Sequence, residues 1–265
     1  MLPRRLLGAT QISVSALGLG TVKFGRNEGV KYPKAFRIPD LDYLKRYLAF
    51  AKDQGVNLLD TAPAYGSSEE RLGELIAGDR QSWILCSKAG EEFSEGKSQY
   101  FFDSYHLEKS VLRSLKRLKT DYLDVLLIHS NGEDMKIIRD YEVFQTLAQF
   151  KQRGLIRAYG MSTKTLEGGL ATLKAADLAM VTFNPSHREE EQVLDQALSA
   201  RKGILIKKAL ASGHLAQIGG KDPIGQSMNL IFQKPAVSSV IVGTIQPKHL
   251  KENIAAVNHA LGIEV

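Results

Sequence analysis

The sequence predicts a (β/α)8 barrel with a short N-terminal β-hairpin cap, built as a single domain over residues 1–265. Eight short apolar runs alternate with eight longer helical patterns along the chain. Each short run is almost continuously apolar, as expected of parallel strands that are buried on both faces. A doubly wound open sheet is the rival fold. The count of eight, and the absence of a glycine-rich turn after the first run, favour the barrel.

The elements follow in order from the N-terminus. The first dozen residues are expected to form the cap, with the Gly-Ala-Thr of residues 8–10 as its turn. The expected strands cover residues 14–20, 56–60, 83–88, 122–130, 155–162, 178–184, 204–209 and 238–243. The expected helices cover residues 41–55, 68–78, 105–120, 139–154, 166–176, 189–203, 224–233 and 247–261. Ser68 and Pro247 are typical residues at a helix start, and several helices end at glycine.

Composition is that of an ordinary globular enzyme. Hydrophobic residues make up 43% and charged residues 24% of the chain. No apolar run approaches the roughly 18–20 residues that a membrane span needs. Cys86 is the only cysteine, so a disulfide framework is excluded. We therefore expect a cytoplasmic protein that does not bind a membrane.

The net charge of +6 allows two interpretations, nucleic-acid binding or the handling of anionic small molecules. The positive residues are dispersed among acidic ones, as in the stretch HLEKSVLRSLKRLKTDYLD at residues 106–124. That pattern is typical of a solvated surface. We expect no nucleic-acid partner.

Ionisable residues gather at the ends of the expected strands. Asp60 ends the second strand, with Tyr65 in the loop that follows, while Lys88 ends the third and His129 the fourth. In a (β/α)8 barrel the carboxyl ends of the strands form the active face. These four side chains are therefore expected to converge although they are far apart in sequence.

Each of these residues also has a plain structural explanation. Asp60 could cap the next helix, Tyr65 could be a half-buried ring, and Lys88 could extend along apolar surface to reach water. His129 could be a core histidine. Together they suggest more, because a buried ammonium favours a phenolate and a carboxylate keeps that ammonium charged. A neutral imidazole can hydrogen-bond a substrate oxygen. The set predicts a tuned general acid for carbonyl reduction, with hydride supplied from elsewhere.

Five motifs resemble those of the aldo-keto reductases: LLDTAPAYGSSEERLGELI, CSKAG, YLDVLLIHS, RGLIRAYGMS and VSSVIVGTIQPKHLKENI. The resemblance runs in order along almost the whole chain. It implies a catalytic tetrad of Asp60, Tyr65, Lys88 and His129, with Tyr65 as proton donor. It also implies NADPH (NADH being possible) extended across the barrel mouth without a Rossmann fingerprint, a small-molecule carbonyl substrate, and no metal.

The same resemblance implies three groups of cofactor contacts. Near the nicotinamide are Thr21, Asp60 and Ser162, along the pyrophosphate are Ser212 and Gly213, and around the adenosine are Thr244, Glu252 and Asn253.

Three positions depart from the family pattern. Met180 stands where a glutamine usually holds the carboxamide, and Lys207 where an aromatic ring usually stacks on the nicotinamide. His249 stands where many members place an arginine on the 2′-phosphate, which weakens the expectation of NADP preference. Lys248 or His249 could still supply positive charge there, although an arginine fork clamps phosphate better.

Three interpretations of Lys207 are open. Its cation could lie near the nicotinamide and disfavour NADP+ relative to NADPH, or it could point at the pyrophosphate. Alternatively, Lys207 could be a surface lysine.

The segment of residues 91–104 reads as a long insertion after the third strand. Its aromatic residues could line a substrate pocket or pack the loop down, and they are Phe93, Tyr100, Phe101 and Phe102. Trp83 is expected in the core.

Three functions compete. The leading one is an NADP-dependent aldo-keto reductase. A Schiff-base aldolase would use Lys88 as nucleophile, but it needs a neutral lysine and Asp60 opposes that. The third is a reductase-like subunit that binds nicotinamide and reports redox state with little turnover. The substrate and the oligomeric state are not readable from the sequence.

Overall fold

The computed structural model describes residues 1–214 and 222–263. Eight strands form a closed barrel in the order β10-β11-β12-β3-β4-β5-β8-β9, and each neighbouring pair is parallel. Their bounds are β3 Leu17–Gly20, β4 Leu58–Asp60, β5 Ile84–Ala89, β8 Leu123–His129, β9 Ile156–Ser162, β10 Leu178–Thr182, β11 Gly203–Lys207 and β12 Val237–Val242. The predicted (β/α)8 barrel is confirmed.

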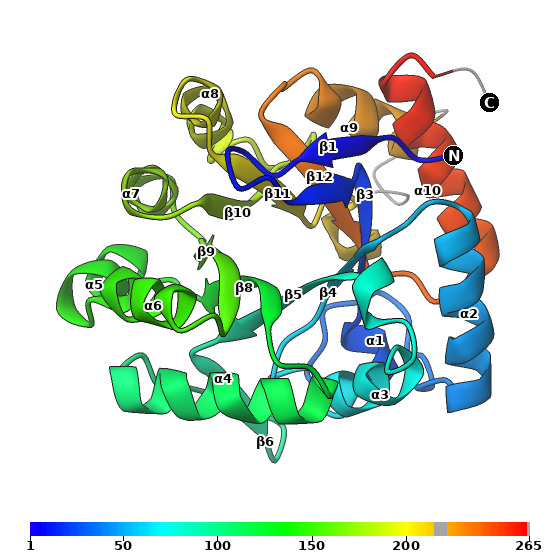
Figure 1. Ribbon diagram of the computed structural model, residues 1–265. Coiled ribbons are helices and arrows are strands. Elements are labelled where there is room, and N and C mark those ends of the chain that lie inside the picture. Colours follow the sequence, from blue (N-terminus) through cyan, green and yellow to red (C-terminus); the bar gives the residue numbers. More distant parts are fainter. Residues whose placement is uncertain (215–221, 264–265) are drawn as a thin grey trace.

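Helices surround the strands (Figure 1). Those that match the predicted ones are α2 Leu41–Asp53, α3 Ser68–Leu75, α4 Ser104–Leu118, α6 Val143–Gln152, α7 Leu166–Ala175, α8 Glu191–Ser199, α9 Pro223–Phe232 and α10 Pro247–Ala260. Short segments α1 Val22–Gly25, α5 Asp134–Asp140, η1 Arg80–Ser82 and η2 Ala211–Gly213 complete the described helices. The predicted helix at residues 139–154 begins later, because Glu142 is left-handed with φ of 48° and separates α5 from α6.

The N-terminal cap is a hairpin of β1 (Arg4–Leu6) and β2 (Ser13–Ser15), paired antiparallel as predicted. Its apolar residues Leu7, Ile12 and Val14 pack against the barrel interior. The guanidinium of Arg5 donates to the carbonyl of Val237 at 2.8 Å. The hairpin therefore closes the amino-terminal end of the barrel and is fastened to the last strand.

Two apolar layers hold the barrel together. An inner cluster fills the barrel and includes Leu58, Cys86, Val125, Met180 and Leu205. A larger outer cluster, which includes Trp83, lies between strands and helices. Because the strands are buried on both sides, their sequences are continuously apolar.

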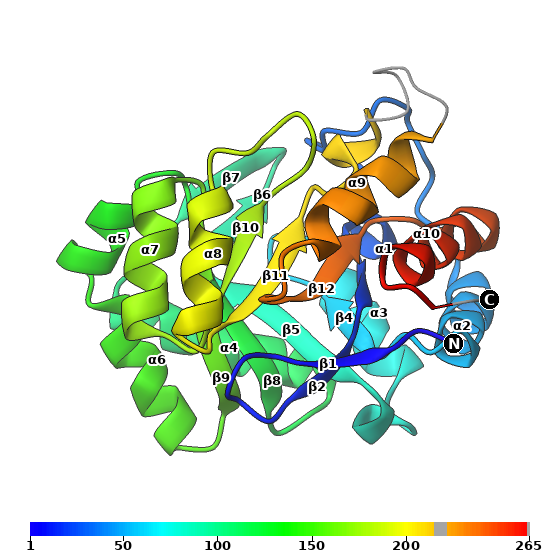
Figure 2. The same cartoon turned by 90° about the horizontal axis from the view of Figure 1, so that it is seen from above.

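A second hairpin, β6 (Glu91–Ser94) and β7 (Lys97–Tyr100), follows β5. The sequence had indicated only an insertion here. Figure 2 shows this hairpin and the β1–β2 hairpin at opposite ends of the barrel. Most of the insertion's aromatic residues pack the segment down. Phe102 is in the core with Tyr100 stacked on it, and the Arg26 guanidinium lies 3.3 Å from the ring centre of Phe93.

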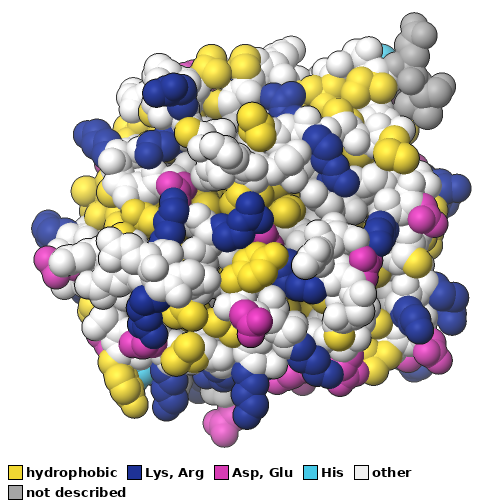
Figure 3. Space-filling view, viewed as in Figure 1, with side chains coloured by type: hydrophobic (Ala, Val, Ile, Leu, Met, Phe, Trp, Pro, Cys, Tyr) yellow, Lys and Arg dark blue, Asp and Glu magenta, His cyan; other side chains and the backbone are white. Residues whose placement is uncertain are grey.

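Charged side chains of both signs are interspersed on the face shown in Figure 3. Within residues 1–214 and 222–263, none of the helices is both long enough and apolar enough to span a membrane.

Candidate active site

A buried ion pair joins the ends of β4 and β5. Nζ of Lys88 lies 2.6 Å from Oδ1 of Asp60 and donates to the carbonyl of Thr61 at 2.9 Å. Both side chains are almost inaccessible, at 2% and 5% exposure. Burial lowers the pKa of Lys88, but neighbouring groups, of which Asp60 contributes most, outweigh it, so that this pKa lies above its usual range. The lysine is a fixed ammonium, and Asp60 does not cap α3.

Tyr65 lies beside that ammonium, in the loop between β4 and α3. Nζ of Lys88 is 4.9 Å from the centre of its ring. Burial raises the pKa of Tyr65 to about 12, and Asp60 contributes in the same direction while Lys88 opposes both. The sequence had predicted a lowered pKa. The ammonium acts with the expected sign, but desolvation of the phenol outweighs it.

His129 ends β8 and faces Tyr65, with ring centroids 6.2 Å apart and planes at 84°. Its Nδ1 lies 2.7 Å from Oε2 of Glu91, the first residue of β6. The two atoms are close enough for an ion pair, but the ring N–H direction is not aligned on that oxygen, so the contact is not a linear hydrogen bond. Burial lowers the pKa of His129, and Glu91 opposes this shift. Three residues of the predicted tetrad thus lie at the ends of the neighbouring strands β4, β5 and β8, and Tyr65 lies beside them in the loop after β4.

Thr21 serves the framework of this site. Its hydroxyl donates to the carbonyl of Asp60 at 3.0 Å and lies 2.8 Å from the hydroxyl of Ser68. The residue has no exposed surface. The side chain thus connects β3, β4 and α3, and offers no exposed atom to the nicotinamide that the family resemblance assigned to it.

Lys207 points across the barrel mouth. Its Nζ donates to the hydroxyl of Ser162 at 2.9 Å and to the carbonyl of Thr163 at 2.5 Å. Burial lowers the pKa of Lys207 to about 7. Met180 is buried in the barrel interior one strand away. Lys207 is therefore not a free surface lysine, because its Nζ is held by the last residue of β9 and by the residue that follows it.

Further lysines surround this end of β11. Burial, and then the charges of Lys31 and Lys164, lower the pKa of Lys208. The next loop carries Ser212 and Gly213, both left-handed with φ of 57° and 92°. Non-glycine residues rarely adopt this conformation, and such strain is concentrated at functional sites.

The residues predicted around the adenosine lie at the start of α10. The hydroxyl of Thr244 accepts from the backbone N–H of Gln246 at 3.1 Å. His249 and Glu252 are exposed on the first turns of the helix, whereas Asn253 is buried. The amino terminus of a helix attracts anions, so His249 is placed where a phosphate group would be favoured.

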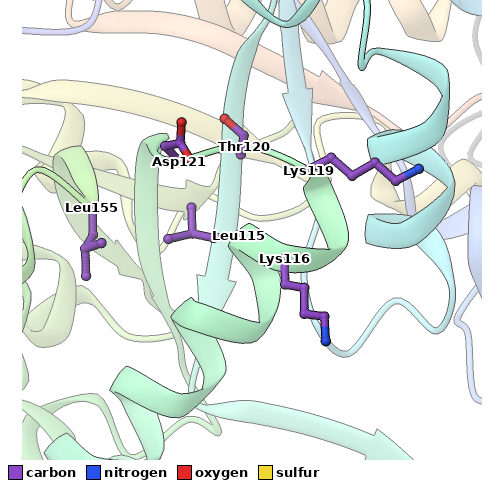
Figure 4. Close-up of a pocket in the computed structure, with 6 residues that line it drawn as sticks. All are labelled: Leu115, Lys116, Lys119, Thr120, Asp121 and Leu155. Carbon is purple, nitrogen blue, oxygen red and sulfur yellow. The ribbon is translucent and has the colours of Figure 1, made fainter.

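A surface hollow lies elsewhere, at the carboxyl end of α4 (Figure 4). Its lining residues are Leu115, Lys116, Lys119, Thr120, Asp121 and Leu155. Thr120 and Asp121 lie in the short connection before β8, so the hollow is at the opposite end of the strands from the tetrad. It does not belong to the candidate site.

Glu91 was not identified from the sequence, although a signal existed. Residues 91–100 read as two short strands around Glu95 and Gly96, whose φ values are 51° and 75°. A two-residue turn with both φ positive is a typical β-hairpin connection. Recognising the hairpin would have placed Glu91 two residues from the end of the strand that carries Lys88.

A closed (β/α)8 barrel with a buried Lys–Asp pair, a tyrosine and a histidine at one rim is the architecture of a carbonyl-reducing oxidoreductase. The model of the Aldo/keto reductase family matches residues 16–223. The chain belongs to this family.

Individual relatives agree with this assignment. The uncharacterized oxidoreductase YqkF of Bacillus subtilis is 30% identical, over 96% of this chain and 91% of that protein. A crystal structure of PA4992, a candidate aldo-keto reductase from Pseudomonas aeruginosa, is 50% identical with a TM-score of 0.89, over 97% and 96% of the two chains. An aldo-keto reductase from Bacillus halodurans in its holo form has a TM-score of 0.81 at 23% identity. The match covers 97% of this chain and 91% of that chain, and it supports the fold.

Proposed function

We propose that the protein reduces an aldehyde or ketone to an alcohol with NADPH, and that Tyr65 donates the proton to the carbonyl oxygen. The observation that carries this proposal is the buried Lys88–Asp60 pair beside Tyr65. The family membership supports oxidoreductase chemistry in general. A cytoplasmic location remains part of the proposal.

The residues supply the proton in a defined way. Since the pKa of Tyr65 is about 12, its phenol is protonated at neutral pH. Bound reduced nicotinamide supplies hydride to the carbonyl carbon. As negative charge develops on the carbonyl oxygen, the Tyr65 proton moves to it and the Lys88 ammonium stabilises the resulting phenolate. Asp60 keeps the ammonium charged and in place.

The chain's own residues fit the cofactor. In addition to burial, the charges of Lys208 and Lys164 lower the pKa of Lys207, and those of Lys31 and Lys164 lower the pKa of Lys208, so these lysines form a group of positive charge that suits a pyrophosphate. Ser162 and Lys207 present polar groups at the nicotinamide end, where the usual glutamine is replaced by the buried Met180. His249 and Lys248 lie exposed on the first turn of α10, where they would contact the 2′-phosphate.

A Schiff-base aldolase is disfavoured by the same geometry. Its lysine must lose a proton before it attacks a carbonyl. The pKa of Lys88 lies above its usual range, and its Nζ is engaged with Asp60 and Thr61.

Purified protein mixed with NADPH and 4-nitrobenzaldehyde tests the proposal through the loss of NADPH absorbance. Consumption of NADPH that depends on the aldehyde is expected. Cofactor binding without consumption, across several aldehydes and ketones, would instead indicate the nicotinamide-binding sensor subunit.

Replacing Lys207 by tyrosine should change the balance between the two redox forms of the cofactor. Below pH 7 the charged lysine should weaken binding of NADP+ relative to NADPH, by on the order of 1 kcal/mol, or about fivefold. Because the pKa of Lys207 is about 7, the bias should fade as the pH rises above that value. Fluorescence titration with both forms at two pH values measures it. An identical ratio in wild type and variant contradicts the nicotinamide placement.

Replacing His249 by arginine should favour NADPH over NADH. A guanidinium hydrogen-bonded to the 2′-phosphate contributes about 1.5–3 kcal/mol, which corresponds to roughly a tenfold gain or more. His259, in the last turn of the same helix, provides the matched control as His259→Arg. Titrations with both cofactors should show a change in the ratio of the NADPH and NADH dissociation constants only in the first variant. Equal changes in both would mean that general positive charge, and not position, is responsible.

A further inference from the structure

His129, the histidine of the predicted tetrad, has a carboxylate partner outside the barrel. Oε2 of Glu91 lies 2.7 Å from Nδ1 of His129. Glu91 stands on the β6–β7 hairpin, whereas His129 ends β8. The two side chains are 11% and 19% exposed, so water screens the contact little.

Glu91 is held as a carboxylate. Its Oε1 accepts from the hydroxyl of Ser98, on β7, at 2.6 Å. Burial raises the pKa of Glu91, but His129, Ser98 and Arg26 outweigh it and bring this pKa to about 2. Arg26 is fixed in turn, because its guanidinium donates to the carbonyl of Ala64 at 2.9 Å and lies against Phe93.

A carboxylate at this distance decides where the imidazole carries its proton. An ionised carboxylate only accepts hydrogen bonds, and a lone pair on Nδ1 at 2.7 Å would be repelled by it. Although the contact is not a well-aligned hydrogen bond, repulsion of the lone pair still favours the neutral ring with its hydrogen on Nδ1. Its other nitrogen, Nε2, then carries a lone pair.

We propose that Glu91 is a positioning residue that fixes neutral His129 as the Nδ1–H tautomer and leaves Nε2 as a hydrogen-bond acceptor toward the substrate oxygen. The effect on substrate binding rests on the proposed function, whereas the tautomer itself can be tested without it. In this state His129 accepts a hydrogen bond from the hydroxyl of an alcohol. Only the imidazolium, with hydrogens on both nitrogens, donates to a carbonyl oxygen.

The charges around the ring set when each form is present. Glu91 on β6 favours the imidazolium, while Lys88 on β5 and Lys207 on β11 disfavour it, and the neutral phenol of Tyr65 faces the ring. Burial is the largest effect and lowers the pKa of His129 below its usual range. The neutral Nδ1–H form therefore predominates at neutral pH. The KM for a carbonyl substrate should rise as the pH increases through this pKa.

Nitrogen NMR of the cofactor-free protein tests the tautomer directly. The spectrum of 15N-histidine-labelled wild type distinguishes Nδ1–H from Nε2–H for each of the six histidines. The signals missing from His129→Gln assign His129. We expect the Nδ1–H pattern in wild type and a gain of the Nε2–H form in Glu91→Gln, because the amide can donate to Nδ1. A wild-type proton on Nε2 overturns the proposal without any need for a variant.

Glu92→Gln is the matched control, since Glu92 is the neighbouring residue of the same hairpin and pairs with Arg113 instead. It should leave the His129 tautomer and the pH profile unchanged. Because the Nε2–H form that Glu91→Gln gains can donate to a carbonyl oxygen without protonation, this variant should lower the KM for an aldehyde above the pKa of His129, by up to about tenfold, and flatten the rise of KM with pH. An unchanged tautomer and pH profile in Glu91→Gln would also refute the role of Glu91. Because the NMR result requires no turnover, it separates this inference from the reductase activity itself.

Discussion

Replacing Tyr65 by phenylalanine is expected to lower kcat for aldehyde reduction by about 10³-fold, which corresponds to roughly 4 kcal/mol of lost transition-state stabilisation. The variant removes only the acidic hydroxyl. The ring keeps its edge contact with His129 and its position near the ammonium of Lys88. Affinity for NADPH should therefore be almost unchanged, and a fluorescence titration beside the rate measurement checks this.

Tyr105→Phe is the control for this substitution, because Tyr105 is an exposed residue at 67% and touches none of the tetrad. It should retain wild-type activity. Undiminished turnover in Tyr65→Phe would remove Tyr65 from the role of proton donor. The pH profile adds a check, since a phenol with a pKa of about 12 stays protonated below that value. Tyr65 should therefore not limit reduction at moderately alkaline pH.

Replacing Lys88 by methionine should both inactivate and destabilise the protein. Asp60 would remain buried, at 4% exposure, without its counter-charge. Breaking a buried ion pair from one side costs about 3–5 kcal/mol, mostly because an uncompensated charge is left behind. Urea denaturation should show this loss in the free energy of unfolding.

Two companion variants make the measurement decisive. Lys88→Met combined with Asp60→Asn has no unpaired charge, so it should recover a large part of the stability while remaining inactive. Lys52→Met breaks the exposed Lys52–Asp79 pair, whose side chains are 45% and 46% accessible, and should cost no more than about 1 kcal/mol. Equal losses from Lys88→Met and Lys52→Met would show that the Asp60–Lys88 pair is not effectively buried.

The barrel could be predicted because its strands, such as Leu123–His129, are buried on both faces and therefore continuously apolar. The convergence of Asp60, Lys88 and His129 followed from the same fold, since the carboxyl ends of parallel strands lie at one rim. The contacts among these residues did not have to be predicted one by one. The strand order placed these side chains together.

The rest depended on contacts that a linear pattern does not contain. Thr21 is turned inward by hydrogen bonds to Asp60 and Ser68, which sequence position alone does not reveal. The pKa of Tyr65 depends on how completely the fold removes water from the phenol, and that burial outweighed the charge of Lys88. Glu91 reaches His129 only because an antiparallel hairpin folds back beside β8.

The fastening of the N-terminal hairpin to the last strand has a consequence for how the chain folds during synthesis. The Arg5–Val237 hydrogen bond joins residues separated by 232 positions, and Ser238 bonds the carbonyl of Leu6 in the same way. The hairpin of residues 4–15 therefore cannot complete its hydrogen bonds until residues 237 and 238 have been synthesised. Contacts of such long range slow folding, and the apolar cluster of Leu7, Ile12 and Val14 stays incomplete until Leu205 and Ile241 have joined it.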